Sequence, residues 1–284
     1  MCIEIGSFGV TEESKINGDY QKRTKSDCES YENEEDVLEE VVVEGARERH
    51  KGVYILPNLF TTGALFSGFY AIVAAMNGEF DNAAVAIFIA MILDGLDGRV
   101  ARLTNTQSKF GEEYDSLSDM VSFGVAPALV AFSLNLHTLG NVGWIGTFIY
   151  VAGTALRLAR FNTQIGSVDK RYFVGLPSPA AAALVAAFVW TFHTMEQTKF
   201  FAVVTMIVVT SAGILMVSNV LYHSFKDFDL KRRVPFTAML IIVLVFAIIS
   251  SDPPGVLLVG FLVYVFSGPA LALNRKLKHN EKKQ

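Results

Sequence analysis

Cysteine, histidine and tryptophan are scarce in this chain of 284 residues, and so are charged side chains. It has two Cys, five His and two Trp, and charged residues make up 18% of it against 51% hydrophobic residues. The cysteines, Cys2 and Cys28, show no metal-binding spacing, and no internal repeat is visible. This balance excludes an ordinary soluble domain, gives no reason to expect a nucleic acid partner, and favours a protein that crosses a membrane several times.

The first 46 residues have few large apolar side chains and a marked excess of acidic ones. They hold 13 Asp and Glu against 4 Lys and Arg, whereas the remainder holds 15 against 20. No helical period persists there, and the first 30 residues lack the apolar segment of a signal peptide. We therefore expect residues 1–48 to form an acidic, disordered tail.

Long apolar segments recur after residue 55, each near the ~20 residues that cross a bilayer as a helix. They predict an all-α membrane bundle of about eight transmembrane helices. Six of these fall in a core at 49–222, and residues 223–284 add a loop, two further helices and a basic tail. The predicted spans are 56–76, 82–103, 112–136, 143–162, 178–195, 200–222, 235–250 and 255–273.

The positive charges of the connections predict the orientation of these spans. One set of connections, counted from Arg47, holds 19 Lys and Arg, and the other set holds one, Lys199. Because cytoplasmic loops carry the excess of Lys and Arg, both termini and the connection between the second and third spans are expected in the cytoplasm. That side also predicts reduced thiols at both cysteines. In a bacterial cell this places the protein in the inner membrane with its polar residues on the cytoplasmic face.

Four aspartates flank that connection, in DGLDGRVARLTNTQSKFGEEYDSLSD. Asp94 and Asp97 are three residues apart at the end of one span, and Asp115 and Asp119 are four apart at the start of the next, so each pair lies on one helix face. A short turn brings the pairs together, and carboxylates this close at the edge of a membrane need a counter-charge. Oxygen ligands without His or Cys favour Mg²⁺ or Mn²⁺, with Ca²⁺ a further fit, over zinc.

Small and basic residues lie between the two pairs. Glycines such as Gly98 and Gly111, with Ala101, let a ligand approach the backbone closely. Arg102 and Lys109 bring positive charge for phosphate oxygens. Carboxylates, divalent metals and basic residues together indicate phosphoryl transfer, in which metal ions neutralise developing charge.

The spacing D-x2-D-G-x2-A-R-x8-G-x3-D-x3-D resembles the signature of the CDP-alcohol phosphotransferases, and LPNLFTTG resembles their first span. The resemblance implies that a CDP-activated lipid donates its phosphatidyl group to an alcohol and releases CMP. It implies two divalent metals on the four aspartates and the donor's pyrophosphate, with Asp119 as general base, and a homodimer. The expected contacts of CDP-diacylglycerol are Asn58, Thr61, Gly98, Ala101, Arg102, Lys109 and Gly111.

A second stretch, ALRLARFN followed by GLPSPAAA, bears on the alcohol. Arg157 and Arg160 are three residues apart on one helix face and suit a carboxylate or a phosphate of the acceptor. With SLSDMVSFGVAPA, these stretches resemble the phosphatidylserine synthase branch of the family, which implies L-serine as acceptor. Asn162 is expected either to contact serine or to cap its helix. Glycerol 3-phosphate, an inositol phosphate or choline are the alternative acceptors, and a divalent-cation transporter is the alternative of another class.

Overall fold

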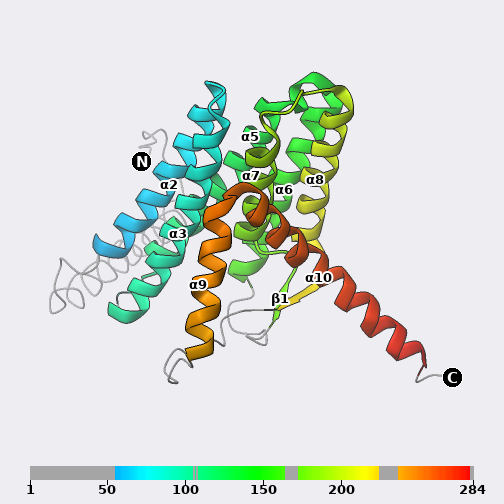
Figure 1. Cartoon of the computed structure of the whole chain (residues 1–284). Helices are drawn as coiled ribbons and strands as arrows, with labels where there is room; N and C mark the ends of the chain where they lie inside the picture. Colours follow the sequence, from blue (N-terminus) through cyan, green and yellow to red (C-terminus); the bar gives the residue numbers. More distant parts are fainter. Residues whose placement is uncertain (1–54, 105, 107, 164–171, 224–235, 282–284) are drawn as a thin grey trace, which may run out of the picture. The chain divides into compact units, whose positions relative to one another are not determined.

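The computed structural model describes residues 55–104, 106, 108–163, 172–223 and 236–281. The predicted acidic tail lies outside the described residues and stays a prediction. The described elements, drawn in Figure 1, are helices α2 (Ile55–Met76), α3 (Phe80–Thr104), α4 (Lys109–Asp119), the π-helix η1 (Met120–Val125), α5 (Ala126–Leu134), the 3₁₀ helix η2 (Leu136–Leu139), α6 (Asn141–Thr163), α7 (Ser178–Phe192), α8 (Lys199–Val217), α9 (Phe236–Ser251) and α10 (Pro253–Glu281), and strands β1 (Tyr172–Val174) and β2 (Leu221–His223).

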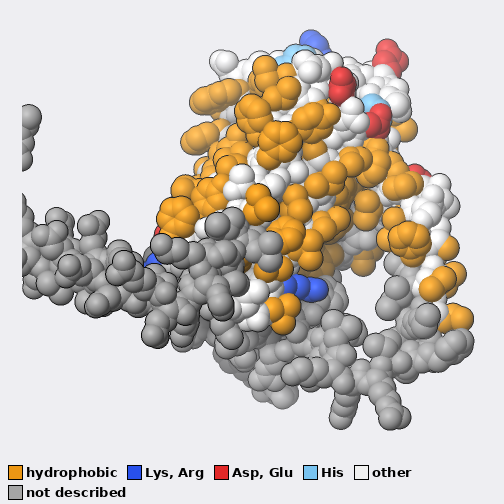
Figure 2. Space-filling view, turned by 90° about the vertical axis from the view of Figure 1, so that its left-hand side faces the viewer, with side chains coloured by type: hydrophobic (Ala, Val, Ile, Leu, Met, Phe, Trp, Pro, Cys, Tyr) orange, Lys and Arg blue, Asp and Glu red, His pale blue; other side chains and the backbone are white. Residues whose placement is uncertain are grey.

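Each predicted span coincides with a helical segment, so the helical class of the bundle is confirmed. Among the described residues, five segments are long and apolar enough to cross a membrane: Pro57–Met76, Lys109–Leu134, Asn141–Thr163, Lys199–Val217 and Pro253–Leu271. The others are α3, which carries charged residues at its end, and α7 and α9, which have 15 and 16 residues. Crossings by these three, and hence eight spans, stay predictions. Figure 2 shows a broad band of hydrophobic side chains across one face, as lipid contact requires.

Helix α7 lies at the centre of the bundle and packs against α3, α5, α8 and α10. It is buried on every side from Ala181 to Val189, which explains why its sequence is apolar all round and rich in alanine. Small side chains let helices approach closely in a membrane protein, where packing rather than hydrophobicity drives association. The core of the bundle is therefore a set of close helix contacts that places the ends of α3, α4 and α6 near one another.

The third predicted span is interrupted by a π-helix directly after Asp119. The interruption is held by two neighbouring helices: Ser122 donates to the carbonyl of Ala64 in α2 at 3.0 Å, and the buried Tyr150 of α6 donates to the carbonyl of Phe123 at 3.1 Å. A widened turn of this kind is rare and is frequently found at functional sites. It sets the direction in which the end of α4 faces the rest of the bundle.

A two-stranded antiparallel ribbon departs from the all-α prediction. β1 and β2 pair with Val174 opposite Leu221, and they join the connections that follow α6 and α8. Gly175 has a φ of +82°, and a Cβ there would overlap the carbonyl of Met216, so glycine is required at this turn. Both strands are three residues long and rich in aromatic and branched side chains, which suit a short pairing that helical periodicity does not reveal.

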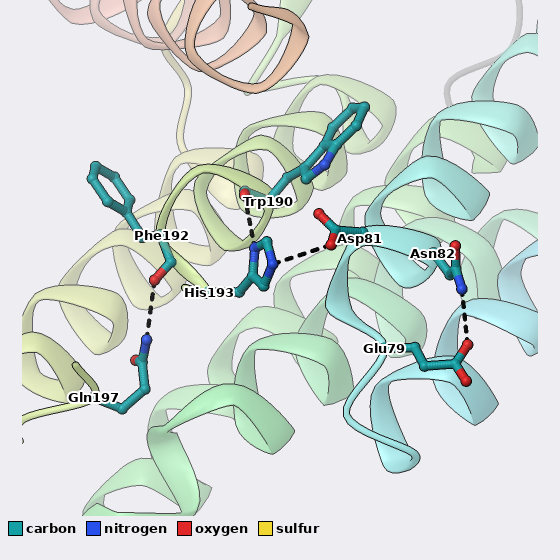
Figure 3. Close-up of polar contacts among 7 residues, drawn as sticks. All are labelled: Glu79, Asp81, Asn82, Trp190, Phe192, His193 and Gln197. Carbon is teal, nitrogen blue, oxygen red and sulfur yellow. Dashed lines mark hydrogen bonds and ion pairs between the residues drawn. The ribbon is translucent and has the colours of Figure 1, made fainter. Parts of the chain in front are cut away.

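At the far end of the bundle from the strands, the start of α3 and the end of α7 are joined by a contact between Asp81 and His193. His193 lies 3.2 Å from Asp81 through Nε2, while its Nδ1 lies 2.9 Å from the carbonyl oxygen of Trp190 (Figure 3). The Asp81 side chain is 62% exposed, so a surface pair of this kind adds little stability by itself. It lies in a loop region predicted to face away from the cytoplasm.

Candidate active site

Carboxylates from two helices converge where α3 ends and α4 begins. Asp94, Asp97 and Asp115 each offer an oxygen atom within 4.8 Å of the others. Asp119, one turn beyond Asp115, is not part of this group of three, but its carboxyl group contacts that of Asp94. The structure thus brings three of the predicted ligands into one cluster and places the fourth at its edge.

Hydrogen bonds from α2 and the α3–α4 turn hold the cluster in place. Thr61, which is buried, donates its hydroxyl to Asp97 Oδ2 at 2.7 Å and also lies 3.2 Å from the carbonyl of Pro57. Ser108 caps α4 by accepting the N–H of Gly111 at 3.0 Å. Ser118 donates to the carbonyl of Thr61 at 3.2 Å, which fixes α4 against α2. The helix that carries Asp115 is therefore clamped at both ends.

The donor set of the cluster suits a hard divalent cation. Asp97 is only 5% exposed, and Asp115 Oδ1 is buried without a hydrogen-bond partner among the described residues. Buried carboxylate oxygens without a donor are costly unless a cation compensates them. Three carboxylates with no His or Cys fit Mg²⁺ or Mn²⁺.

A cavity of about 220 Å³ opens beside the cluster, between the start of α2, the end of α3 and the start of α4. Asp97 and Asp115 form its acidic wall, and Arg102 adds a positive charge. Gly98 leaves its backbone open, because the nearest side-chain atom to a Cβ there would be 4.0 Å away. The remaining lining residues are Pro57, Asn58, Thr61, Ala101, Thr106, Ser108, Gly111 and Glu112. Carboxylates and a guanidinium on one small cavity suit a metal-bound phosphate compound.

Comparison with known proteins agrees with this arrangement. The sequence model of the family described as CDP-alcohol phosphatidyltransferase matches residues 54–208, which contain the whole cluster and cavity. The chain belongs to the CDP-alcohol phosphatidyltransferase family.

Several curated members of this family are similar to the chain over long stretches. A CDP-diacylglycerol–serine O-phosphatidyltransferase of Helicobacter pylori is 41% identical over 197 residues, which is 68% of this chain and 82% of the relative. Proteins of the same name from Saccharomyces cerevisiae and Methanocaldococcus jannaschii are 44% and 38% identical, covering 42% and 50% of this chain and 48% and 63% of the relatives. The likeness therefore extends across bacterial, eukaryotic and archaeal members.

Of the seven residues expected to contact CDP-diacylglycerol, six line the cavity of this phosphatidyltransferase. Lys109 does not; it is exposed at the first position of α4. Thr61 lines the cavity, but its hydroxyl is engaged by Asp97. The cavity is also lined by Thr106, Ser108 and Glu112, which were not predicted; the polar turn between the two aspartate pairs was the available signal.

The three residues expected at the acceptor have different surroundings. Arg157 interacts electrostatically with Asp119 and donates to Ser178 at 2.7 Å. Arg160 turns toward the end of α8, where its Nη1 lies 3.3 Å from the carbonyl of Val217 and 3.2 Å from Asn219 Oδ1. Asn162 donates to Ser116 Oγ at 3.0 Å, next to Asp115. Of the two arginines, Arg157 is the one for which the described part of the chain shows an electrostatic interaction with an aspartate of the site, Asp119.

Proposed function

We propose that this protein is a phosphatidylserine synthase, which transfers the phosphatidyl group of CDP-diacylglycerol to the hydroxyl of L-serine and releases CMP. The observation that carries the proposal is the convergence of Asp94, Asp97 and Asp115 within 4.8 Å at a polar cavity, in a chain of this family. The names of the relatives specify CDP-diacylglycerol and serine, and we extend both substrates to this chain.

The cavity is the proposed site of the nucleotide end of CDP-diacylglycerol. Arg102 supports this assignment because a guanidinium binds phosphate oxygens in a forked geometry. Gly98 leaves its backbone accessible from the cavity, and Asn58 offers an amide next to Gly111, which also lines the cavity. Lys109 lies outside the lining and is proposed only as a source of positive charge at the cavity entrance.

Two divalent ions, Mg²⁺ or Mn²⁺, are the proposed cofactors, held by Asp94, Asp97, Asp115 and Asp119. The oxygen-only donor set supports this assignment, and so does Asp115 Oδ1, which has no hydrogen-bond partner within the described part of the chain. When bound, such ions supply positive charge that neutralises the phosphate oxygens during transfer. Ca²⁺, which also prefers oxygen ligands, is the further candidate ion.

Asp119 is the proposed general base. Its carboxyl group contacts that of Asp94 and interacts electrostatically with Arg157, which supports a position between the donor cavity and the residues assigned to the acceptor. A base in hydrogen-bond reach of the serine hydroxyl takes its proton as the oxygen forms a bond to phosphorus. The bond between that phosphorus and the CMP oxygen breaks, and CMP leaves with the electron pair.

Arg157 is the proposed partner of the serine carboxylate, because its charge lies beside Asp119. We propose that Arg160 and Asn162 lie further from the acceptor than Arg157 does. Arg160 orders the start of the α8–β2 connection, and Asn162 supports α4 through Ser116. We further propose that the cluster faces the cytoplasm, that both termini lie on that side of the cell membrane, and that the protein acts as a homodimer.

The decisive experiment uses the purified protein in detergent or liposomes with CDP-diacylglycerol and Mg²⁺ or Mn²⁺. CMP release is measured with L-serine, glycerol 3-phosphate, an inositol phosphate, choline and ethanolamine, and the lipid product is identified by mass spectrometry. Phosphatidylserine should form, and ethanolamine, which lacks a carboxylate, should react poorly. If CMP were released rapidly with a different alcohol and not with serine, that alcohol would be the acceptor. The family mechanism would still hold.

A further inference from the structure

The guanidinium of Arg157 is held by a hydrogen bond at one of its three nitrogen atoms. Its Nη1 donates to Ser178 Oγ at 2.7 Å, whereas its Nε is buried and has no hydrogen-bond acceptor among the described residues. A guanidinium carries five N–H donors in a rigid fork, so engaging Nη1 fixes the direction of the remaining edge, formed by Nε and Nη2. The guanidinium that carries this edge also interacts electrostatically with Asp119.

Ser178 is well placed to set this direction. It is 0% exposed and is the first residue of α7, between Pro177 and Pro179. A serine at the start of a helix commonly caps it, but α7 has no side-chain cap, and the Ser178 hydroxyl instead accepts a hydrogen bond from Arg157 in α6. Pro177 fixes the local backbone, since its ring restricts φ, and therefore also fixes the position of the hydroxyl.

The last helix approaches the same arginine from another direction. Tyr264 of α10 lines one cavity together with Pro177 and Pro179, the residues on either side of Ser178, and its ring packs 5.6 Å from that of Tyr222 in β2. Tyr222 in turn donates to the carbonyl of Val265 at 3.1 Å, which ties α10 to the ribbon at this height. Tyr264 lies beyond residues 54–208, so the family match does not reach it.

We propose that Ser178 is a positioning residue for Arg157, which turns the Nε–Nη2 edge of the guanidinium toward the carboxylate of the acceptor, and that Tyr264 forms the opposite wall of this acceptor subsite. The inference rests on the proposed function, since it names the residues that hold the serine carboxylate beside Asp119. An edge with two parallel donors matches the two oxygens of a carboxylate and discriminates against alcohols without one.

The test is a set of saturation curves for L-serine and for CDP-diacylglycerol on the full-length protein. Ser178→Ala should raise KM for serine by about tenfold, which corresponds to ~1.4 kcal/mol, while KM for CDP-diacylglycerol stays near the wild-type value. Ser178→Thr, which keeps a hydroxyl, should restore much of the serine affinity. Tyr264→Phe should raise KM for serine in the same direction. Ser211→Ala is the matched control. Among the described residues, the Ser211 hydroxyl donates to the carbonyl of Val208 in its own helix, at 3.0 Å.

A double variant shows whether Ser178 acts through Arg157. If it does, Ser178→Ala should add little to the rise in serine KM already caused by Arg157→Lys, because coupled residues give non-additive effects. Additive effects, or a Ser178→Ala variant that loses thermal stability and kcat at an unchanged serine KM, would overturn the positioning role. A wild type that forms phosphatidylserine while Ser178→Ala keeps its serine KM overturns this inference alone, whereas a wild type that releases no CMP with serine overturns the proposed function as well.

Discussion

The hydroxyl of Thr61 offers a direct test of how the carboxylate cluster is organised. It donates to Asp97 Oδ2 at 2.7 Å in a site where Asp97 is only 5% exposed. Thr61→Val keeps the branched shape and removes this donor. A hydrogen bond to a charged group contributes roughly 1.5–3 kcal/mol, and partners that orient a metal ligand typically change metal affinity by about 10- to 100-fold. We therefore expect the metal concentration for half-maximal activity to rise by roughly 10- to 100-fold.

Two measurements check this expectation. One is the initial rate of CMP release as a function of Mg²⁺ concentration, and the other is Mn²⁺ binding in the absence of substrate, followed by electron paramagnetic resonance. Thr191→Val is the matched control, because Thr191 of α7 donates at 2.8 Å to the carbonyl of Ala187 in its own helix, as Thr61 does to Pro57, but has no carboxylate partner in the described structure. An unchanged metal requirement in Thr61→Val would show that this hydrogen bond does not orient Asp97 for a cation.

Three further predictions concern the site and the membrane. Asp115→Asn should abolish transfer at every Mg²⁺ concentration and leave the unfolding midpoint in detergent near that of the wild type; substantial activity would contradict the metal assignment. Arg157→Lys should raise KM for serine by about tenfold, whereas Arg160→Lys should raise it less, because Arg160 is engaged at the end of α8. Saturation curves for serine measure both KM values, and a larger rise in Arg160→Lys would assign the serine carboxylate to Arg160. Reporter fusions at Gln284 and within residues 137–141 should lie on opposite sides of the membrane, and labelling on one side would refute the predicted orientation.

Helical periodicity and spacing predicted much of the site from the sequence. Residues three or four apart share a helix face, so the two aspartate pairs were expected to converge across one short turn, and Asp94, Asp97 and Asp115 do so. Six of the predicted donor contacts likewise line one cavity, because they belong to the same three helix ends. Local spacing was informative here because the site is built from neighbouring elements.

Features set by long-range contacts were not visible in the sequence. The π-helix after Asp119 depends on partners in α2 and α6, and the pairing of β1 with β2 joins segments about 50 residues apart. Arg157 and Arg160 share a helix face, yet their contacts differ because Ser178 lies near one and the end of α8 near the other. Periodicity gives the face of a helix but not the identity of its partner.

The attachment of α10 to the ribbon bears on how far the protein can be truncated from its C-terminal end. A Cβ on Gly268 would overlap the ring of Tyr222, so the helix passes too close to the ribbon to be a loosely added extension. A protein shortened to the region shared with its family would lose this contact and Tyr264 together, although both helices that carry the aspartates would be retained. We therefore expect the smallest active unit to be longer than the part of the chain that the family model matches, and to extend at least through the contact at Gly268.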